Sequence, residues 1–286
     1  MMIALCLLMI TVMLAMPGVT TAAARDALRV WGFDVAPSLF PYMVLCRMIA
    51  LRLRRSGFPA APAAALLGLM GGSPSGAAVI SVYGSAGAIG RRQIWMLCAF
   101  TGTISPMFLL STTAVWIGDA ALCRLLLAAH IAGAATAALV VRLAVPPDRP
   151  TGSLPCKGRV QTEEGDPIAQ SVHGILGVGG CIVFFSVLAS AAGALTPRTS
   201  PLPGAIVHAA LEIAGGMHTL CAVPLPPMPR AVLMAAASGF SGLSILTQNL
   251  VFLRPLGIGM AQLIGFGLLR AVGAGAAMIC LLTLFG

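Results

Sequence analysis

The sequence predicts an all-α membrane protein with several membrane-crossing helices. Of its 286 residues, 58% are hydrophobic and only 9% are charged, whereas soluble domains carry roughly 25% charged residues. The mean hydropathy is +0.98. Helices are expected because they satisfy their own backbone inside a bilayer, and because strands of a membrane barrel would alternate polar and apolar residues. The apolar runs of this chain do not alternate.

Six apolar runs are long enough to cross a hydrocarbon core about 30 Å thick. In chain order they cover residues 2–22, 37–51, 93–116, 120–145, 174–195 and 257–285. The first run has the length of a secretory signal and is followed by small residues, but it lacks a basic start. Cleavage and a retained helix both stay open, and we favour the retained helix.

Two further apolar segments are interrupted in the middle by glycine and serine. In residues 63–85 the break is Gly71–Gly76, and the two arms, about 10–12 Å long as helices, are too short to cross. In residues 231–252 the break is Ser238–Ser244. Glycine tolerates a positive φ and proline cannot donate a backbone hydrogen bond, so such breaks suit sharp turns. We expect both segments to be re-entrant hairpins.

Basic residues beside the runs indicate the orientation in the membrane. They cluster at residues 52–55, at residues 91–92 and around the polar stretch 146–171. Placing all three clusters in the cytoplasm predicts cytoplasmic N- and C-termini in the cell membrane and puts the two hairpins on opposite faces. The net charge of +9 is thereby assigned to topology, and no nucleic-acid partner is expected.

This arrangement predicts an inverted repeat, as in many transporters. Residues 1–35 would form an N-terminal membrane helix and interfacial segment, 36–145 the first repeat, 146–171 a cytoplasmic linker and 172–286 the second repeat. Ser75–Gly76 would then align with Ser241–Gly242. Residues 203–223 are ambiguous because they contain Glu212 and two histidines. A central charge costs about 2.5–3.5 kcal/mol, which favours an interfacial or cavity-lining helix.

Polar side chains at the breaks predict a solute site near the middle of the bilayer. Interrupted helices leave backbone groups without partners, and short donors and acceptors beside them suit a polar, nucleoside-like solute. Ser105–Pro106 should kink the third run toward the first hairpin. The residues assigned to substrate binding are Ser73, Ser75, Gly76, Thr101, Ser105, Ser241, Gly242, Ser244, Gln248 and Asn249. The alternative is that these side chains only satisfy one another.

Glu212 is the only acidic residue inside an apolar segment of the second half. An intramembrane carboxylate indicates a functional site, so we assign Glu212 to coupling with a proton or sodium ion. The alternative is a structural carboxylate bonded to helix N-termini or to Arg254 or Arg270. The histidines at 130, 208 and 218 are expected to be packing or interfacial residues.

No metal site, cofactor or enzyme activity is expected. Seven of the eight cysteines lie in or beside apolar runs, without CxxC or paired histidine spacing. The sequence has no nucleophile beside a base, no phosphate-binding loop and no carboxylate pair. The expected partners are the lipid bilayer, a small solute and a coupling ion, and the oligomeric state is open.

Five motifs in order resemble the sporulation integral membrane proteins that carry nucleoside-recognition (Gate) domains. They lie at residues 37–42, 72–77, 100–108, 211–216 and 238–248. Ser73 stands where the family has an aromatic residue, and residues 100–103 also depart from its pattern. Residues 239–244 are also similar to a hairpin of concentrative nucleoside transporters. The resemblance implies a permease with a role in sporulation, or alternatively a non-transporting scaffold for spore envelope assembly.

Overall fold

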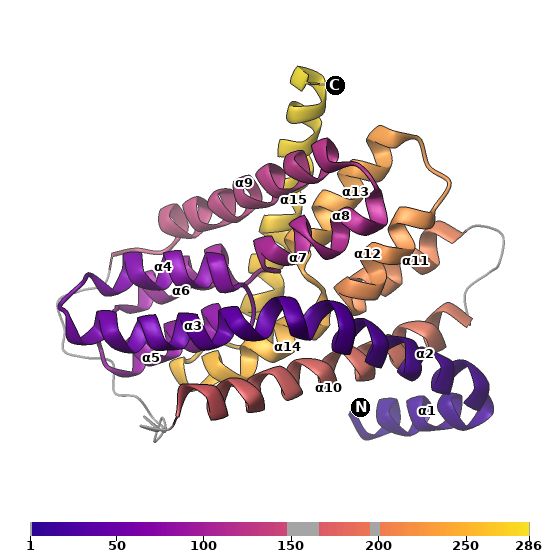
Figure 1. Cartoon of the computed structure of the whole chain (residues 1–286), viewed down its shortest axis with the longest axis horizontal. Helices are drawn as coiled ribbons and strands as arrows, with labels where there is room; N and C mark the ends of the chain where they lie inside the picture. Colours follow the sequence, from indigo (N-terminus) through magenta and orange to yellow (C-terminus); the bar gives the residue numbers. More distant parts are fainter. Residues whose placement is uncertain (1, 148–165, 195–200, 286) are drawn as a thin grey trace.

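The computed structural model describes residues 2–147, 166–194 and 201–285 and is all-helical over them, which confirms the predicted fold class (Figure 1). In the first half the elements are α1 (Met2–Ala15), α2 (Pro17–Arg29), the π-helix η1 (Val30–Val35), α3 (Ala36–Arg55), α4 (Ala60–Gly71), α5 (Ser75–Ser85), α6 (Arg91–Thr101), α7 (Pro106–Leu110), α8 (Thr112–Ile117) and α9 (Ala120–Ala144). In the second half they are α10 (Pro167–Ala194), α11 (Pro201–Leu211), α12 (Ile213–Ala222), α13 (Pro227–Phe240), α14 (Gly242–Leu253), the 3-10 helix η2 (Arg254–Leu256) and α15 (Met260–Phe285).

Within the described residues, six helical stretches are long and apolar enough to cross a membrane, as many as expected, but they are not the same six. They are Pro17–Leu53, Arg91–Leu110, Ala120–Ala144, Pro167–Gly193, Pro227–Leu256 and Met260–Phe285. Most of the predicted linker, residues 148–165, lies outside the described residues. Its last part belongs to a helix, since α10 begins at Pro167.

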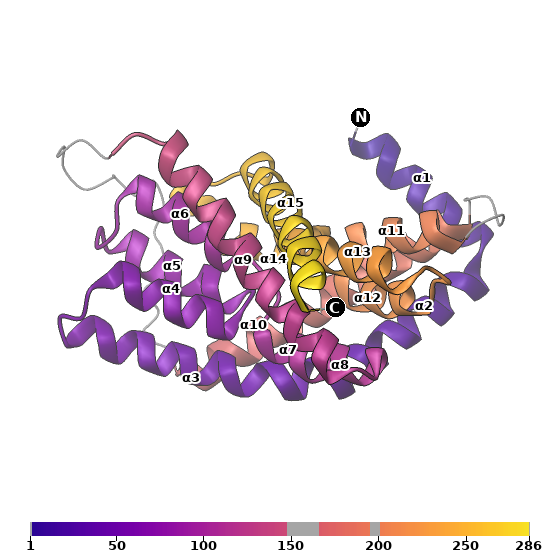
Figure 2. The same ribbon diagram turned by 90° about the horizontal axis from the view of Figure 1, so that it is seen from above.

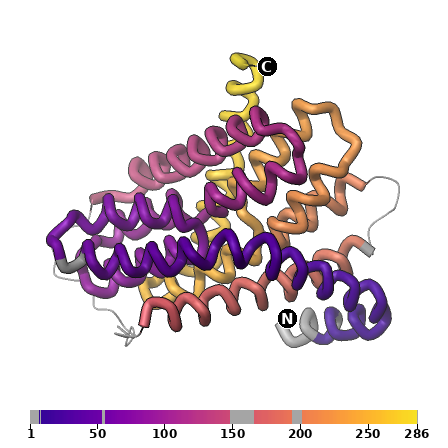
Figure 3. The backbone as a smooth tube through the Cα atoms, viewed as in Figure 1, coloured from indigo at the N-terminus to yellow at the C-terminus, as the bar shows by residue number. Residues whose placement is uncertain are grey.

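The N-terminal region differs from the expectation. Residues 2–22 are not one helix, because α1 ends at Ala15 and Met16 leaves helical geometry with φ −131° and ψ 54°. Met16 precedes Pro17, and proline disfavours the α conformation in the residue before it. Figure 3 shows the chain turning between α1 and α2. From Pro17 the helical path continues through η1 and α3 as one stretch. The predicted second run, residues 37–51, lies inside this stretch, whereas the first run is divided between α1 and α2 and is not one crossing helix.

The first interrupted segment is a helical hairpin, as predicted. α4 and α5 pack along each other, joined by Gly72, Ser73 and Pro74. Gly72 has φ +60°, and a Cβ there would lie 2.6 Å from the backbone nitrogen of Ser105. Only glycine allows both this turn and this close approach. That the hairpin enters and leaves the membrane on one face stays a prediction.

The second predicted hairpin, at residues 231–252, is not found. α13 and α14 do not pack along each other but follow one another as an interrupted helix within the stretch Pro227–Leu256. The hairpin of the second half is instead α11–α12, whose two helices pack tightly. Residues 203–223, expected as one interfacial or cavity-lining helix, therefore form a pair of helices with Glu212 at its tip.

The same order of elements occurs twice in the chain: a long helix, a hairpin, an interrupted helix and a second long helix. In the first half these are α3, α4–α5, α6–α7 and α9, and in the second half α10, α11–α12, α13–α14 and α15. Equivalent positions are 140 residues apart, since Gly72 and Glu212 lie at the hairpin tips and Phe100–Gly102 corresponds to Phe240–Gly242. With this offset of 140 residues, Ser241–Gly242 corresponds to Thr101–Gly102, and not to Ser75–Gly76 as expected.

The last helices of the two halves, α9 and α15, pack against each other, crossing in the view of Figure 1 and lying side by side in that of Figure 2. Glycine permits the crossing, because a Cβ on Gly133 would lie 2.6 Å from the carbonyl oxygen of Arg270 and one on Gly273 would lie 3.1 Å from the Cα of Gly133. Gly133 and Gly273 are also 140 residues apart. Small residues at such crossings are typical of membrane helices.

The packing of α11 on α12 predicts the effect of a single methyl group. A Cβ on Gly216 would lie 2.2 Å from the Cα of Ala209, so Gly216→Ala should lower the free energy of unfolding by about 1–3 kcal/mol. Thermal unfolding in detergent measures this. The matched control is Gly180→Ala on α10, where nothing lies within 4 Å and the better helix propensity of alanine should be neutral or stabilising. Equal melting temperatures for both variants would contradict the hairpin packing.

Candidate functional site

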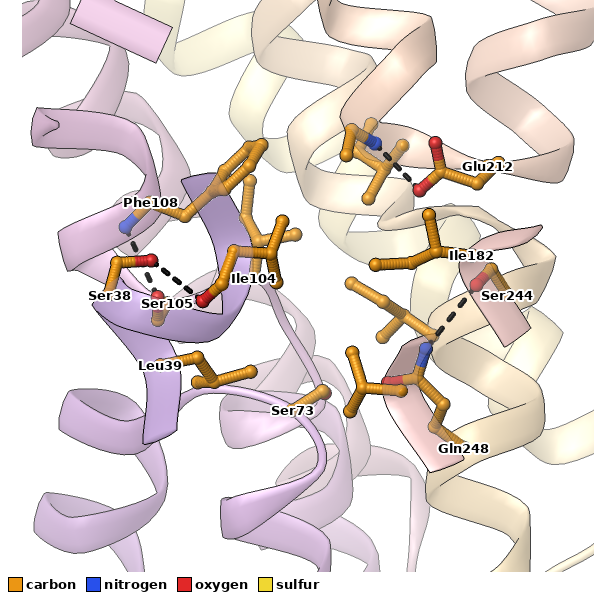
Figure 4. Close-up of a pocket in the computed structure, with 15 residues that line it drawn as sticks. Ser38, Leu39, Ser73, Ile104, Ser105, Phe108, Ile182, Glu212, Ser244 and Gln248 are labelled. Carbon is orange, nitrogen blue, oxygen red and sulfur yellow. Dashed lines mark hydrogen bonds between the residues drawn. The ribbon is translucent and has the colours of Figure 1, made fainter. Parts of the chain in front are cut away.

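A small cavity lies between the two halves of the chain, with one wall from each (Figure 4). The first-half wall consists of Val35, Ser38, Leu39, Ser73, Ile104, Ser105 and Phe108, and the second-half wall of Val178, Ile182, Glu212, Ile213, Ala214, Ser244, Ile245 and Gln248. The volume is about 50 Å³. One water needs about 10–15 Å³, so this conformation has room for a few waters. A mostly apolar lining with a few converging polar groups is typical of ligand sites.

The polar groups of the first wall come from a hairpin tip docked on an interrupted helix. The backbone N–H of Ser73 donates to the carbonyl of Thr103 at 2.7 Å, which joins the α4–α5 tip to the break between α6 and α7. Ser105 begins α7 by accepting a hydrogen bond from the N–H of Phe108 at 3.2 Å, with Pro106 in the first turn. The predicted kink at Ser105–Pro106 and its position beside the first hairpin are confirmed.

The second wall has the same construction. Gly242, at the break between α13 and α14, has φ +76°, and a Cβ there would lie 3.2 Å from both the carbonyl of Ala209 and the nitrogen of Ile213. The α11–α12 tip therefore docks on this break. In the first turn of α14, Ser244 lies in the cavity wall, and its hydroxyl accepts a hydrogen bond from the amide of Gln248 at 3.3 Å.

Glu212 is the only carboxylate in the cavity wall. Its side chain is 2% exposed and caps α12, accepting from the N–H of Ala214 at 2.9 Å and of Gly215 at 2.6 Å. This is the structural bond to a helix N-terminus that the sequence left open. The suggested arginine partners are not found: Arg254 is exposed and Arg270 bonds elsewhere.

Five of the eleven predicted site residues line the cavity, namely Ser73, Ser105, Glu212, Ser244 and Gln248. The other six are absent from the wall: Ser75, Gly76, Thr101, Ser241, Gly242 and Asn249. Gly76 packs α5 against α6, since a Cβ there would lie 3.1 Å from the hydroxyl of Thr101. That hydroxyl donates to the carbonyl of Leu97. Ser241 ends α13 with φ +72° and donates to the carbonyl of Ser238.

Asn249 and Ser75 are buried outside the cavity wall. Both side-chain amide atoms of Asn249 and the hydroxyl of Ser75 are buried and without a hydrogen-bond partner among the described residues. Asn249 faces Gly102, where a Cβ would lie 3.5 Å from its amide nitrogen. It therefore points to the junction of the interrupted helices and not into the cavity.

The sequence reasoning missed most of the cavity lining. Ser38 bonds to the carbonyls of Asp34 and Val35 at the turn from η1 to α3, and it lies in the motif at residues 37–42. The position of Ser38 within that motif is the sequence signal that could have identified it as a site residue. The remaining missed residues are apolar, and no sequence pattern separates a cavity wall from lipid-facing surface. They come from η1, α3, the α6–α7 break, α7, α10, α12 and α14.

Arg270 on α15 occupies the junction between the two interrupted helices. Its guanidinium is 1% exposed and donates to the carbonyl of Gly239 on α13 at 3.0 Å and to those of Cys98 and Ala99 on α6 at 3.3 Å each. These carbonyls lie in the last turns of α6 and α13, where the helix dipole favours a cation. In the part of the chain that the structure covers, the one ion pair is Arg29–Asp26, so Arg270 is held by carbonyls alone.

The chain is similar to a known membrane protein. It is 24% identical over 292 residues to the sporulation integral membrane protein YlbJ of Bacillus subtilis (strain 168), and the match spans 81% of this chain and 70% of the relative. No protein family profile matches the chain, and no solved structure matches it significantly. The chain is thus a multi-pass membrane protein related to a sporulation membrane protein.

The environment of Arg270 predicts that no other residue replaces it. Arg270→Leu leaves buried carbonyls without a donor, and Arg270→Lys cannot reach both helices with a planar fork. Both should lower the free energy of unfolding by about 3 kcal/mol, measured by thermal or chemical unfolding in detergent. The matched control Arg254→Leu changes an exposed arginine and should stay within about 0.5 kcal/mol. Wild-type stability of Arg270→Leu would show that the junction does not depend on this side chain.

Proposed function

We propose that this protein is a membrane permease for a small, uncharged polar solute of the nucleoside class, with the cavity between the two hairpin tips as its binding site. The observation that carries the proposal is the convergence of Ser73, Ser105, Ser244, Gln248 and Glu212 on one buried cavity. They come from two hairpin-and-break units on opposite sides of it. We propose no enzyme activity for it.

The charge of the wall favours a neutral or cationic solute. Glu212 is its single ionisable side chain, and no basic residue lines it. Gln248 can offer both a donor and an acceptor to a base edge, and the serine hydroxyls suit ribose hydroxyls. A nucleotide would bring phosphate charge beside Glu212 without a compensating cation. The solute we propose is therefore the nucleoside and not the nucleotide.

A nucleoside does not fit the closed cavity of about 50 Å³. The two walls belong to different halves of the chain, so binding requires one half to move relative to the other. Alternating exposure of a central site by such a movement is the mechanism typical of inverted-repeat transporters. We assign Glu212 to coupling this movement to an ion.

The recurring order of elements supports an inverted repeat with a new topology. If both hairpins return to the face they start from, three crossings, by α10, α13–α14 and α15, separate the linker from the C-terminus. An odd number of crossings places the two on opposite faces. With the basic clusters near Arg52 and Arg91 and the linker in the cytoplasm, the C-terminus lies outside, in contrast to the expectation from sequence.

A second candidate is a membrane scaffold that acts in spore envelope assembly without transport. The name of the relative places that protein in sporulation and says nothing of a solute, and the cavity is small in this conformation. A scaffold predicts partner proteins that co-purify and depend on exposed loops, with no response to nucleosides.

The topology predicts the behaviour of reporter fusions. Alkaline phosphatase, which is active only outside the cytoplasm, should be active when fused after Phe285 and inactive when inserted in the linker. Green fluorescent protein, which fluoresces when folded in the cytoplasm, should give the opposite pattern. Reporters that place both sites on the same face would reject the three crossings proposed for the second half.

The solute class predicts a selective thermal shift of the purified protein. Uridine or adenosine should raise the melting temperature, and the corresponding monophosphates should not. A ligand at 100 times its Kd stabilises by about 2.7 kcal/mol. Gln248→Ala should lose the response while still folding, and Thr283→Ala, which removes an exposed hydroxyl on α15, should keep it. A flat response to nucleosides, nucleobases and small carboxylates would favour the scaffold.

A further inference from the structure

Three ionisable side chains lie in a row along the hairpin α11–α12. Glu212 at the tip lines the cavity. His208 lies one helical turn earlier on α11 and is half-buried, and His218 lies on α12 and is exposed. The row therefore begins at the proposed solute site and ends at the surface of the molecule.

The side chains of His208 and Glu212 both lie beside Gly215. A Cβ placed on Gly215 would lie 2.7 Å from Nε2 of His208 and 3.2 Å from Oε2 of Glu212. The same Nε2 atom is buried and has no hydrogen-bond partner within the described residues. An unpartnered imidazole nitrogen is thus placed near a buried carboxylate, close enough for one bridging water but not in direct hydrogen-bond contact.

His218 connects His208 with the edge of the molecule. The ring of His208 lies over Gly215, and His218 follows Gly215 by three residues on α12, about one helical turn further from the tip. The ring of His218 packs edge-on against Trp116 on α8, with ring centroids 5.2 Å apart. α8 ends at Ile117, and the exposed Asp119 then caps α9. A tryptophan beside a charged helix end is typical of a membrane–water interface.

Few other ionisable groups are close to this row. The elements that pack against α11 and α12 are α8, α10, α13 and α14. α8 and α14 have no ionisable side chain, α10 carries His173 and Cys181, and α13 carries Arg230. α12 itself adds Cys221. On the hairpin and the elements packed against it, Glu212 is the one carboxylate.

We propose that His218 and His208 carry protons between the membrane face at the α8–α9 turn and Glu212, so that the coupling ion is a proton. The inference rests on the proposed function. Protonated His208 gives the proton on Nε2 to the Glu212 carboxylate and becomes neutral. Protonated His218 then gives a proton to His208, and hydronium at the membrane face returns one to His218. The first transfer breaks an N–H bond and forms an O–H bond, the second breaks and forms an N–H bond, and the third breaks an O–H bond of hydronium and forms an N–H bond.

The contact between His208 and Glu212 can be tested without transport. Histidine-labelled, full-length protein is titrated in detergent and followed by NMR. Glu212→Gln removes a negative neighbour that favours the charged imidazole, so the midpoint of His208 should fall by about 1 pH unit. His173, exposed on α10, is the internal control and should not change. An unchanged His208 midpoint would overturn the proton path.

The path itself is tested by uptake of uridine into proteoliposomes, driven by a pH gradient in sodium-free buffer. His208→Gln and His218→Ala should reduce uptake by about 100-fold while the uridine-induced thermal shift stays as in the wild type. His173→Ala is the matched control and should take up uridine normally. Normal uptake by both path variants, or uptake that requires sodium, would overturn the proposal.

The NMR titration and the uptake assay together distinguish failure of the proton path from failure of the proposed function. If uridine stabilises the wild type but path variants transport normally, the path is wrong and the site stands. If the wild type neither binds nor takes up uridine, the proposed function is wrong. The NMR midpoint of His208 in Glu212→Gln then decides the proton path alone.

Discussion

The guanidinium of Arg270 binds the inner ends of two interrupted helices, and the centre of the molecule is arranged around this interaction. Helices that stop inside an apolar protein leave carbonyls that need donors. One side chain from α15 supplies them for both α6 and α13. Because these carbonyls carry the negative ends of two helix dipoles, the cation is compensated without a carboxylate. The arginine thereby fixes one helix from each half of the chain against α15.

The cavity follows from this arrangement. With α6 and α13 fixed at their inner ends, the breaks that follow them lie at the centre of the molecule. Each break receives the tip of its own hairpin, through Ser73 and Thr103 in the first half and through Gly242 and Ile213 in the second. The two units face each other across a narrow space (Figure 4). Three polar groups of the site are therefore also the groups that make the hairpin tips and cap the helices after them, namely Ser73, Ser105 and Glu212.

Much of the fold is predictable from the sequence because composition and break chemistry are local signals. The low charge content predicted membrane helices, and Gly72 with Pro74 predicted the turn of α4–α5. The pattern of glycine and serine in residues 238–244 marks a break but does not say whether the chain reverses there, which is why the second hairpin was misplaced. The true hairpin tip, at Glu212, has no glycine or proline at the turn itself and was visible only as a carboxylate in an apolar segment.

The candidate site was predictable in part for the same reason. Ser73, Ser105 and Ser244 lie at or beside breaks and Gln248 lies one turn after Ser244 on α14, and all four were found. The sequence does not tell which face of a short helix points to the cavity. Thr101 and Asn249 therefore point to helix junctions instead. Arg270 was recognisable as an intramembrane charge, and its partners were not, because backbone carbonyls leave no trace in a sequence pattern.

The central claim is that the two hairpin-and-break units form one solute site between the halves of the chain. An experimental structure of the full chain in lipid with excess uridine tests it most directly. The account predicts density for the nucleoside in contact with Ser73 on one wall and Gln248 on the other, with the walls further apart than in the closed cavity. Density confined to the lipid-facing surface, or a cavity unchanged and empty at saturating uridine, would contradict it.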